Sequence, residues 1–410
     1  MKDMLLRDIK RAITLPVIVS ALGYFVDIFD LVLFGMLRID SLKDLGLSEE
    51  EILTHGETIL SLQMLGFLLG GILWGVLGDK LGRKQILFGS IALYSIANIA
   101  NAFVTDLVSY NIIRFFAGLG LAGELGAAVT LVSELLDKEI RGYGTMIVAS
   151  VGLLGAVAAG LLANTFHWRV MYFIGGVLGL LLLVARAKVL ESSMFEKAKT
   201  MSVKRGDFLS LFTSLNKFSR YIRVILVGVP IWYAVAILVI FSPEMAKFLG
   251  VRGEVNVKWA IMWTYLGVAV GDVISGTLSQ ILKSRKRSVI VFLIFLSLTV
   301  AAYLLSRGLH VNLLYVLMFL LGVGTGYWAV FITIAAELFG TNLRATVATT
   351  SPNFVRGSVA IITPAFQLLR EDYGMINSAA IIGVIVITLA FISIITLEET
   401  YGKDLDFVEK

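Results

Sequence analysis

The chain has 410 residues, of which 58% are hydrophobic and only 16% are charged. Its mean hydropathy of +0.87 exceeds what a soluble protein can cover with polar surface, so a soluble enzyme or nucleic-acid-binding domain is excluded and a polytopic membrane protein is expected. The net charge is +5, and there is no cysteine to form disulfides, thiolate metal sites or thiol nucleophiles.

The N-terminus is basic and is followed by an apolar run as long as a full membrane span. This run lacks a small-residue cleavage signal, so it is expected to stay as the first helix. In chain order, twelve apolar segments are long enough to span a bilayer: 13–37, 56–78, 86–104, 109–134, 143–165, 168–188, 221–247, 256–283, 288–306, 311–337, 344–370 and 376–398. The fold class predicted is therefore an all-α integral membrane protein.

Lys and Arg gather in the loops that lie on the same side of the membrane as the N-terminus. The positive-inside rule then predicts a multi-pass protein of the cell membrane with both termini in the cytoplasm. The basic charge is thereby explained by topology, and no nucleic-acid partner is expected.

One long polar interruption divides the spans into two sets of six. The boundaries expected are a first bundle at 1–190, a cytoplasmic linker at 191–220, a second bundle at 221–398 and a tail at 399–410. Within the linker, Phe208, Leu211, Phe212 and Leu215 have helical spacing, which favours a short helix lying on the membrane interface. A plain solvated linker is the alternative.

The two sets of spans look like copies of one another. A constant shift superposes Gly66 and Gly70 of the second span on Gly267 and Gly271 of the eighth. Near the fourth and tenth spans, SELLDKEIRG at 133–142 matches AELFGTNLRA at 336–345. Two parallel six-helix repeats are therefore expected.

The loop after the second span, GVLGDKLGRKQ at 75–85, combines glycines with an acidic and several basic residues. Together with RFFAGLGLAGE at 114–124, WRVMYFIGG at 168–176 and the two repeats above, it resembles the signature of the major facilitator superfamily. The acidic pair in YFVDIFD at 24–30 and the NFVRG run at 353–357 are most similar to the metabolite:proton and organic-acid symporters of that superfamily. The resemblance covers nearly the whole chain and implies a pseudo-symmetric pair of six-helix bundles working by alternating access, without a cofactor.

The resemblance also implies a cytoplasmic latch that forms in one state of the carrier and breaks in the other. Its expected residues are Asp79, Arg83, Glu134 and Arg141, with Glu337 and Arg344 as repeat counterparts. The alternative is that the cations only obey the positive-inside rule, which leaves the acidic residues at the helix ends unexplained.

Six ionisable residues fall inside the predicted spans, where each needs a partner, water or a function. They are Asp27, Asp30, Arg114, Glu124, Asp272 and Arg356. At a rise of about 1.5 Å per residue, Asp30 and Arg114 lie at similar depth and are able to pair. Asp27 and Asp30 are three residues apart on one helical face, so either is a candidate carrier of a coupling proton, with Arg114 and Asp272 as further members of the proton-coupling group. A permanent Asp30–Arg114 bridge is the structural alternative.

Arg356 lies near the middle of the eleventh span, close to Asn353, where Pro352 predicts an irregularity in the helix. A guanidinium holds a carboxylate through two parallel hydrogen bonds, so Arg356 is the predicted anion site. The alternative is an internal partner such as Asp272. Other expected substrate-binding residues are Glu124, Tyr327, Trp328, Trp232 and Tyr233, although aromatic residues at helical spacing also pack in cores.

The sequence has no Walker motif, no phosphate-binding loop and no histidine cluster with metal-ligand spacing, so no metal site is predicted and neither ATP-driven transport nor enzyme chemistry is expected. The function predicted is proton-coupled transport of a small organic anion by a monomer embedded in lipid. An osmolyte or sugar symporter, a facilitator or an exporter are the alternatives within transport, and a nontransporting sensor is the alternative outside it.

Overall fold

The structure is a computed structural model and describes residues 11, 13–81, 83–123, 141–193 and 208–403. Nearly all of these residues are helical. The first half contains α2 (Leu15–Asp44), α3 (Glu49–Leu81), α4 (Arg83–Asn101), α5 (Leu107–Leu121), α7 (Arg141–Ala163) and α8 (Trp168–Ser193). The second half contains η2 (Phe208–Phe212), α9 (Leu215–Tyr233), η3 (Ala234–Val239), α10 (Ser242–Leu249), α11 (Val257–Ile281), α12 (Arg285–Leu304), α13 (Val311–Thr325), α14 (Trp328–Leu338), α15 (Thr341–Gly357), α16 (Val359–Tyr373) and α17 (Met375–Thr396).

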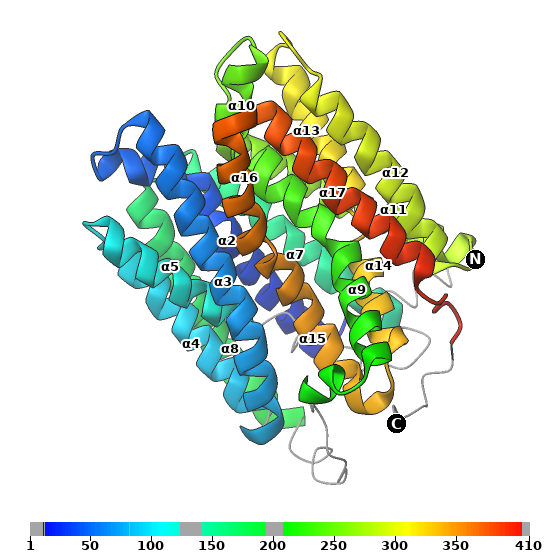
Figure 1. Cartoon of the computed structure of the whole chain (residues 1–410). Coiled ribbons are helices and arrows are strands. Elements are labelled where there is room, and N and C mark those ends of the chain that lie inside the picture. Colours follow the sequence, from blue (N-terminus) through cyan, green and yellow to red (C-terminus); the bar gives the residue numbers. More distant parts are fainter. Residues whose placement is uncertain (1–10, 12, 82, 124–140, 194–207, 404–410) are drawn as a thin grey trace.

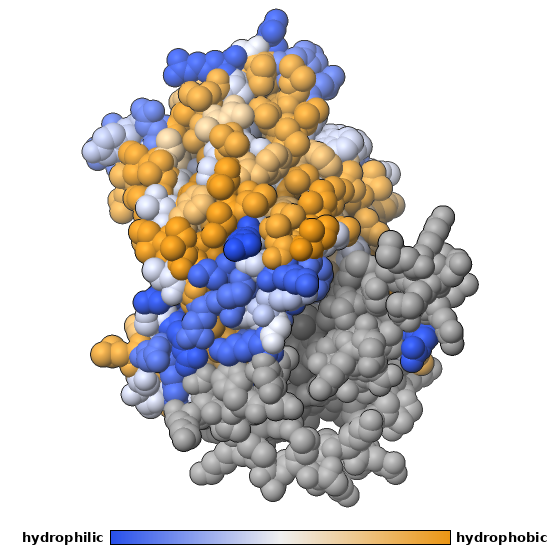
Figure 2. Space-filling view, turned by 90° about the vertical axis from the view of Figure 1, so that its right-hand side faces the viewer, coloured by the Kyte–Doolittle hydropathy of each residue, from blue (hydrophilic) through white to orange (hydrophobic). Residues whose placement is uncertain are grey.

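Each of the twelve predicted spans contains a described helix, although residues 124–134 of the fourth span lie outside the described residues. Within the part of the chain that the structure describes, eight helical segments are long and apolar enough to cross a membrane, and Leu107–Leu121 and Ile147–Ala163 are shorter apolar helices. Figure 2 shows apolar side chains over a broad band of one face, with polar side chains at its borders. Such a surface is stable against lipid rather than water, so the chain is a multi-pass membrane protein.

The helices form two bundles. In the first, α2 packs against α7 and α8, and α3 packs against α5. In the second, α11 packs against α13, and α9 packs against α15 and α17. The bundles lie side by side in Figure 1 and meet where α3 contacts α15 and α16, and where α11 contacts α7.

The repeated glycines lie where helix backbones touch. A Cβ atom on Gly66 or Gly70 of α3 would collide with the backbone of α5. Gly267 and Gly271 of α11 meet the backbone of α13 in the same way. The same close helix contact therefore occurs once in each half, which gives the sequence repeat a physical cause.

Three of the second-half spans are interrupted. The seventh continues from α9 through the π-helix η3, which follows Pro230, into α10. The tenth breaks at Gly326 between α13 and α14, and the eleventh breaks at Ser358 between α15 and α16. Breaks of this kind free backbone N–H and C=O groups inside the protein, where they need local partners.

The linker segment at 208–212 differs from the predicted interfacial α-helix. It is a 3₁₀ turn in which Phe208 and Leu211 are buried, whereas Leu209 is 71% exposed. Phe208 packs against Tyr221 of α9 and Phe354 of α15. Side chains three residues apart lie on the same face of a 3₁₀ helix. Phe208 and Leu211 therefore share one face of the turn, and this face packs on the second bundle.

Candidate functional site

The centre of the molecule holds an ion pair that joins the two bundles. Arg356 of α15 places Nη2 3.7 Å from Oδ2 of Asp27 on α2, and the two side chains are 1% and 0% exposed. Both charges act electrostatically on the hydroxyls of Tyr24 and Tyr265. The sequence suggested Asp272 as the internal partner of Arg356, but the carboxylate beside it is Asp27.

Aromatic rings from both bundles surround the Arg356 guanidinium. Its Cζ atom lies 5.1 Å from the ring centre of Phe67 on α3, 6.0 Å from Trp232 on α9 and 5.8 Å from Trp328 on α14. Arg356 Nε and Nη1 are buried without a hydrogen-bond partner. The guanidinium is desolvated, has unused hydrogen-bond donors and is surrounded by flat aromatic rings. These surroundings suit a ligand with a small anionic group attached to an apolar body.

The second carboxylate of α2, Asp30, lies inside the first bundle rather than between the bundles. Asp30 is fully buried against Gly175 of α8. Its charge is opposed by Arg114 of α5, and the Asn98 side chain lies beside it. Among the residues that the structure describes, Asp30 and Arg114 form no ion pair within 4.0 Å.

Arg114 is instead held by two amides of α4. Its Nη2 donates to Asn98 Oδ1 at 2.5 Å. Its Nε donates to the side-chain amide oxygen of Asn101 at 2.7 Å, in the amide orientation that satisfies both Asn101 and Arg114. The guanidinium also stacks 4.6 Å from the ring centre of Tyr172. The predicted pair is therefore a polar cluster in which Asn98 lies between the two charges.

Asp272 lies at the break in the tenth span. Its Oδ1 accepts a hydrogen bond from the Ala329 N–H at 3.0 Å, at the start of α14. A helix begins with N–H groups that have no partner within the helix, and a carboxylate both binds them and complements the helix dipole. This explains why the second half carries an acid at a position where the first half has Gly71.

We expect Asp272→Ala to lower the thermal stability of the purified protein. Losing a side-chain cap costs about 1 kcal/mol, because the α14 N–H groups lose their acceptor. Thermal unfolding followed by scanning fluorimetry in detergent measures this. Asp272→Asn keeps an acceptor and is the matched control. Equal melting temperatures for the alanine variant and the wild type would contradict the capping role.

Three other predicted binding residues hold helices together in this conformation. Tyr327 donates its hydroxyl hydrogen bond to the Val227 carbonyl of α9, and Tyr233 donates to the Ala379 carbonyl of α17. Asn353 Nδ2 donates to the Ala122 carbonyl beyond α5, across the interface between the bundles. Only Trp232 and Trp328 of the predicted aromatic residues lie against Arg356.

Much of the predicted cytoplasmic latch falls outside the described residues. This holds for Glu134 and for the side chains of Asp79, Arg83 and Arg141. The predicted substrate-binding residue Glu124 also lies outside the described residues. In the second half, Glu337 of α14 pairs with Arg285 at 3.2 Å, and Arg344 Nε donates to the Ala336 carbonyl. Arg285 begins α12 and was not among the predicted residues.

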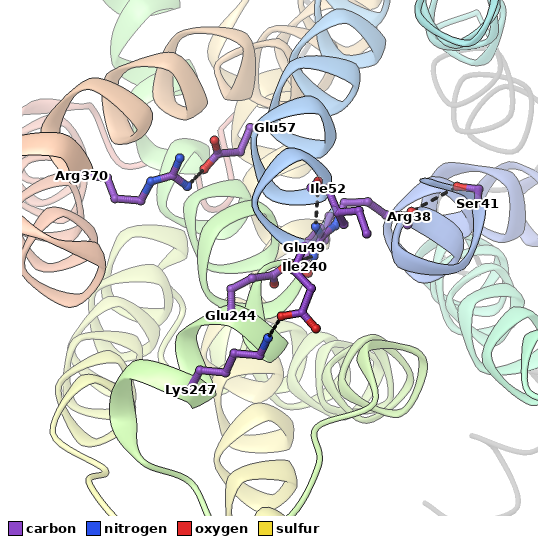
Figure 3. A network of polar contacts seen from close by, with 9 residues as sticks. All are labelled: Arg38, Ser41, Glu49, Ile52, Glu57, Ile240, Glu244, Lys247 and Arg370. Atoms are coloured by element: carbon purple, nitrogen blue, oxygen red, sulfur yellow. Dashed lines mark hydrogen bonds and ion pairs between the residues drawn. The ribbon is translucent and has the colours of Figure 1, made fainter. Parts of the chain in front are cut away.

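The opposite end of the molecule carries contacts that the sequence reasoning missed. Four ion pairs of the described residues join the bundles at the end that is uppermost in Figure 1. We call them the upper-end pairs: Arg38–Glu244 at 2.7 Å, Glu57–Arg370 at 2.6 Å, Glu49–Lys247 at 2.6 Å and Asp40–Lys258 at 2.6 Å. Figure 3 shows the first three, with α2 and α3 contributing one partner of each and the second bundle the other.

The upper-end pairs differ in burial. Arg38 and Glu57 are 0% exposed, and Arg38 also donates to the Ile240 carbonyl and lies over the Phe241 ring. Glu49 and Lys247 are 74% and 64% exposed. The sequence shows charged residues of both signs at this end of each half, but it does not show which of them pair. The upper-end pairs thus hold the two bundles together at this end.

The comparisons with known proteins agree with this architecture. The family model described as the Major Facilitator Superfamily matches residues 20–364. The chain is 27% identical to a probable 4-methylmuconolactone transporter of Cupriavidus pinatubonensis, covering 93% of this chain and 89% of that protein. It is 26% identical to a gentisate transporter of Corynebacterium glutamicum, covering 93% and 88%.

Among solved structures, a D-xylose–proton symporter superposes with a TM-score of 0.68 at 17% sequence identity, covering 95% of this chain and 99% of that chain. At that identity the likeness concerns the fold. The family match over most of the length, the two helix bundles and the charged residues buried between them lead to one assignment. The chain is a transporter that belongs to the Major Facilitator Superfamily.

Proposed function

We propose that this transporter moves small organic anions, with a carboxylate as the recognised group, in symport with protons. The observation that carries the proposal is Arg356, a buried cation midway between the bundles whose Nε and Nη1 have no hydrogen-bond partner. A buried guanidinium is costly unless an anion satisfies it, and a carboxylate does so through two parallel hydrogen bonds.

The surroundings of Arg356 favour an anion that has a flat apolar body. Trp232, Trp328 and Phe67 provide ring faces close to the guanidinium. A sugar offers hydroxyls but no charge to offset the desolvation of Arg356. The names of the relatives from Cupriavidus and Corynebacterium agree with an organic-acid substrate. An osmolyte or sugar remains the alternative that the experiment below separates.

We assign proton coupling to the two carboxylates of α2. Asp27 lies in the site itself, and Asp30 lies one turn further along α2 beside the Arg114 cluster. A carboxylate that is sealed from water in one state and reached by water in the other is able to take up and release a proton during alternating access. Asp30 is then the candidate for the proton that accompanies the substrate.

The proposal includes the topology. We place both termini in the cytoplasm and the upper-end pairs on the outer face of the cell membrane. The moving units are residues 1–190 and 221–398, joined by the linker at 191–220 and followed by the tail at 399–410. A lipid-embedded monomer suffices for this cycle, because the site lies between the two halves of one chain.

Proteoliposomes that contain a trapped pH dye test the proposal. Adding gentisate outside is expected to acidify the lumen in vesicles with wild-type protein. D-xylose and glycine betaine, as the sugar and the zwitterion, are expected to leave the pH unchanged. Asp30→Asn is expected to abolish the acidification while carboxylate binding remains.

Two outcomes contradict the proposal. If a panel of carboxylates causes neither acidification nor uptake in vesicles of confirmed protein content, the anion assignment is wrong. If uptake of labelled gentisate occurs with the same rate in wild type and Asp30→Asn, without any pH change, the protein is a facilitator rather than a proton symporter.

A further inference from the structure

The central ion pair is loose compared with the other buried pairs between the bundles. The Nη2–Oδ2 distance in the Arg356–Asp27 pair is 3.7 Å. The buried upper-end pairs, Arg38–Glu244 and Glu57–Arg370, have distances of 2.7 and 2.6 Å. Charge-assisted N–H···O hydrogen bonds measure about 2.7–2.9 Å, so the upper-end pairs are hydrogen-bonded and the central pair is held by charge alone.

The two members of the central pair come from different bundles and are both sealed from water. Asp27 lies on α2 and Arg356 on α15, and neither is more than 1% exposed. Removing one member of a buried ion pair is strongly destabilising, because the other charge stays buried without compensation. Whenever the site is closed on both sides, Arg356 therefore needs an anion.

A transporter closes its site in two situations during one cycle, once with substrate and once without. With substrate, the carboxylate of the cargo neutralises Arg356 under the proposed function. Without substrate, the only carboxylate that the described residues place within 4.0 Å of Arg356 is Asp27. The loose geometry lets it leave when a better ligand arrives.

Resting on the proposed function, we infer that Asp27 is an internal stand-in for the substrate carboxylate. It neutralises Arg356 while the carrier is empty, which allows the empty carrier to reorient, and the substrate displaces it on binding. Asp27 is thus a positioning residue that decides between net transport and exchange, not a contact for the substrate.

The test separates net transport from exchange in Asp27→Asn proteoliposomes. Net uptake of labelled gentisate into empty vesicles requires the empty carrier to return, and it is expected to fall by roughly 100-fold, as removal of one partner of a buried pair implies. Exchange into vesicles preloaded with unlabelled gentisate requires only the loaded carrier to move, and it is expected to stay close to the wild-type rate.

Affinity provides a second readout that does not depend on turnover. Removing an internal competitor for Arg356 is expected to tighten gentisate binding in Asp27→Asn by about tenfold, a change of about 1.4 kcal/mol. Isothermal titration calorimetry on the detergent-solubilised protein measures it. Asp27→Glu keeps the charge and is expected to retain net uptake. Asp106→Asn makes the same chemical change at a loop residue that caps α5 and serves as the matched control.

The outcomes are distinguishable. Equal losses of net uptake and exchange in Asp27→Asn, with weaker gentisate binding, overturn the stand-in role and make Asp27 part of the substrate contact. The proposed function survives that result, because wild-type transport is unaffected by it. Absence of gentisate and other carboxylate transport in the wild type overturns the proposed function itself.

Discussion

We expect Arg356→Ala to abolish carboxylate transport, while the protein still folds into its two bundles. The substrate loses two charge-assisted hydrogen bonds, each worth roughly 1.5–3 kcal/mol, which corresponds to a fall in affinity of about 100-fold or more. The rings of Phe67, Trp232 and Trp328 remain but offer no replacement charge. Gentisate binding by calorimetry and labelled uptake in proteoliposomes measure the loss.

Arg356→Lys is the informative companion variant. A lysine keeps the positive charge beside Asp27 but replaces the planar fork with a point charge, so weaker binding and partial uptake are expected. Arg252→Gln, at an exposed loop, controls for the loss of a cation as such. If Arg356→Ala transports gentisate as fast as the wild type, the anion site lies elsewhere, and the Arg114 cluster becomes the next candidate.

We expect Arg38→Gln to open the upper end of the molecule. Glu244 is only 14% exposed and loses its partner, which destabilises the closed upper end by about 3–5 kcal/mol. The carrier is then expected to spend most of its time open on the face that we propose is external. Transport slows because the cycle requires this end to close again.

The chain has no cysteine, so a single introduced thiol reports this opening without background. Ile261→Cys is suitable because Ile261 is 1% exposed and lies against Gly35 of the other bundle. Maleimide labelling of this thiol from outside is expected to be slow in the Ile261→Cys protein and fast when Arg38→Gln is added.

Lys247→Gln is the matched control for Arg38→Gln. It breaks an upper-end pair of similar length, but Lys247 and Glu49 are mostly exposed, and exposed pairs contribute about 0–1 kcal/mol. Labelling is expected to stay slow. If Lys247→Gln opens the upper end as much as Arg38→Gln does, burial is not what makes these pairs hold the bundles together.

The sequence was informative about the fold because a bilayer imposes one simple requirement. Runs of about 20 apolar residues had to be helices, and each predicted span contains one. The glycine repeat predicted the duplicated packing of α3 on α5 and of α11 on α13. The breaks at Gly326 and Ser358 could not be predicted from the sequence, because broken and continuous spans have the same hydropathy.

The site was predicted only in part. The depth of a residue in the membrane follows from its position along the helix, but the direction in which its side chain faces does not. Asp30 and Arg114 were placed at the same depth, and they do lie in one cluster, but the amide of Asn98 lies between them. Arg356 was placed at mid-membrane, yet its partner proved to be Asp27 rather than Asp272. Which carboxylate faces a cation depends on the rotation of each helix about its own axis. In spans that are apolar on every face, the hydrophobic pattern does not determine this rotation.

The upper-end pairs also influence whether the first half of the chain pairs with the second half or with another copy of itself. The shift that superposes Gly66 on Gly267 maps Glu244 onto Lys43 and Lys258 onto Glu57. If two copies of the first half met in the same arrangement, Arg38 would face Lys43 and Asp40 would face Glu57, so like charges would oppose each other at both places. At these two places the duplicated halves have lost self-complementarity, whereas Glu57 would still face a cation, because the same shift maps Arg370 onto Arg169.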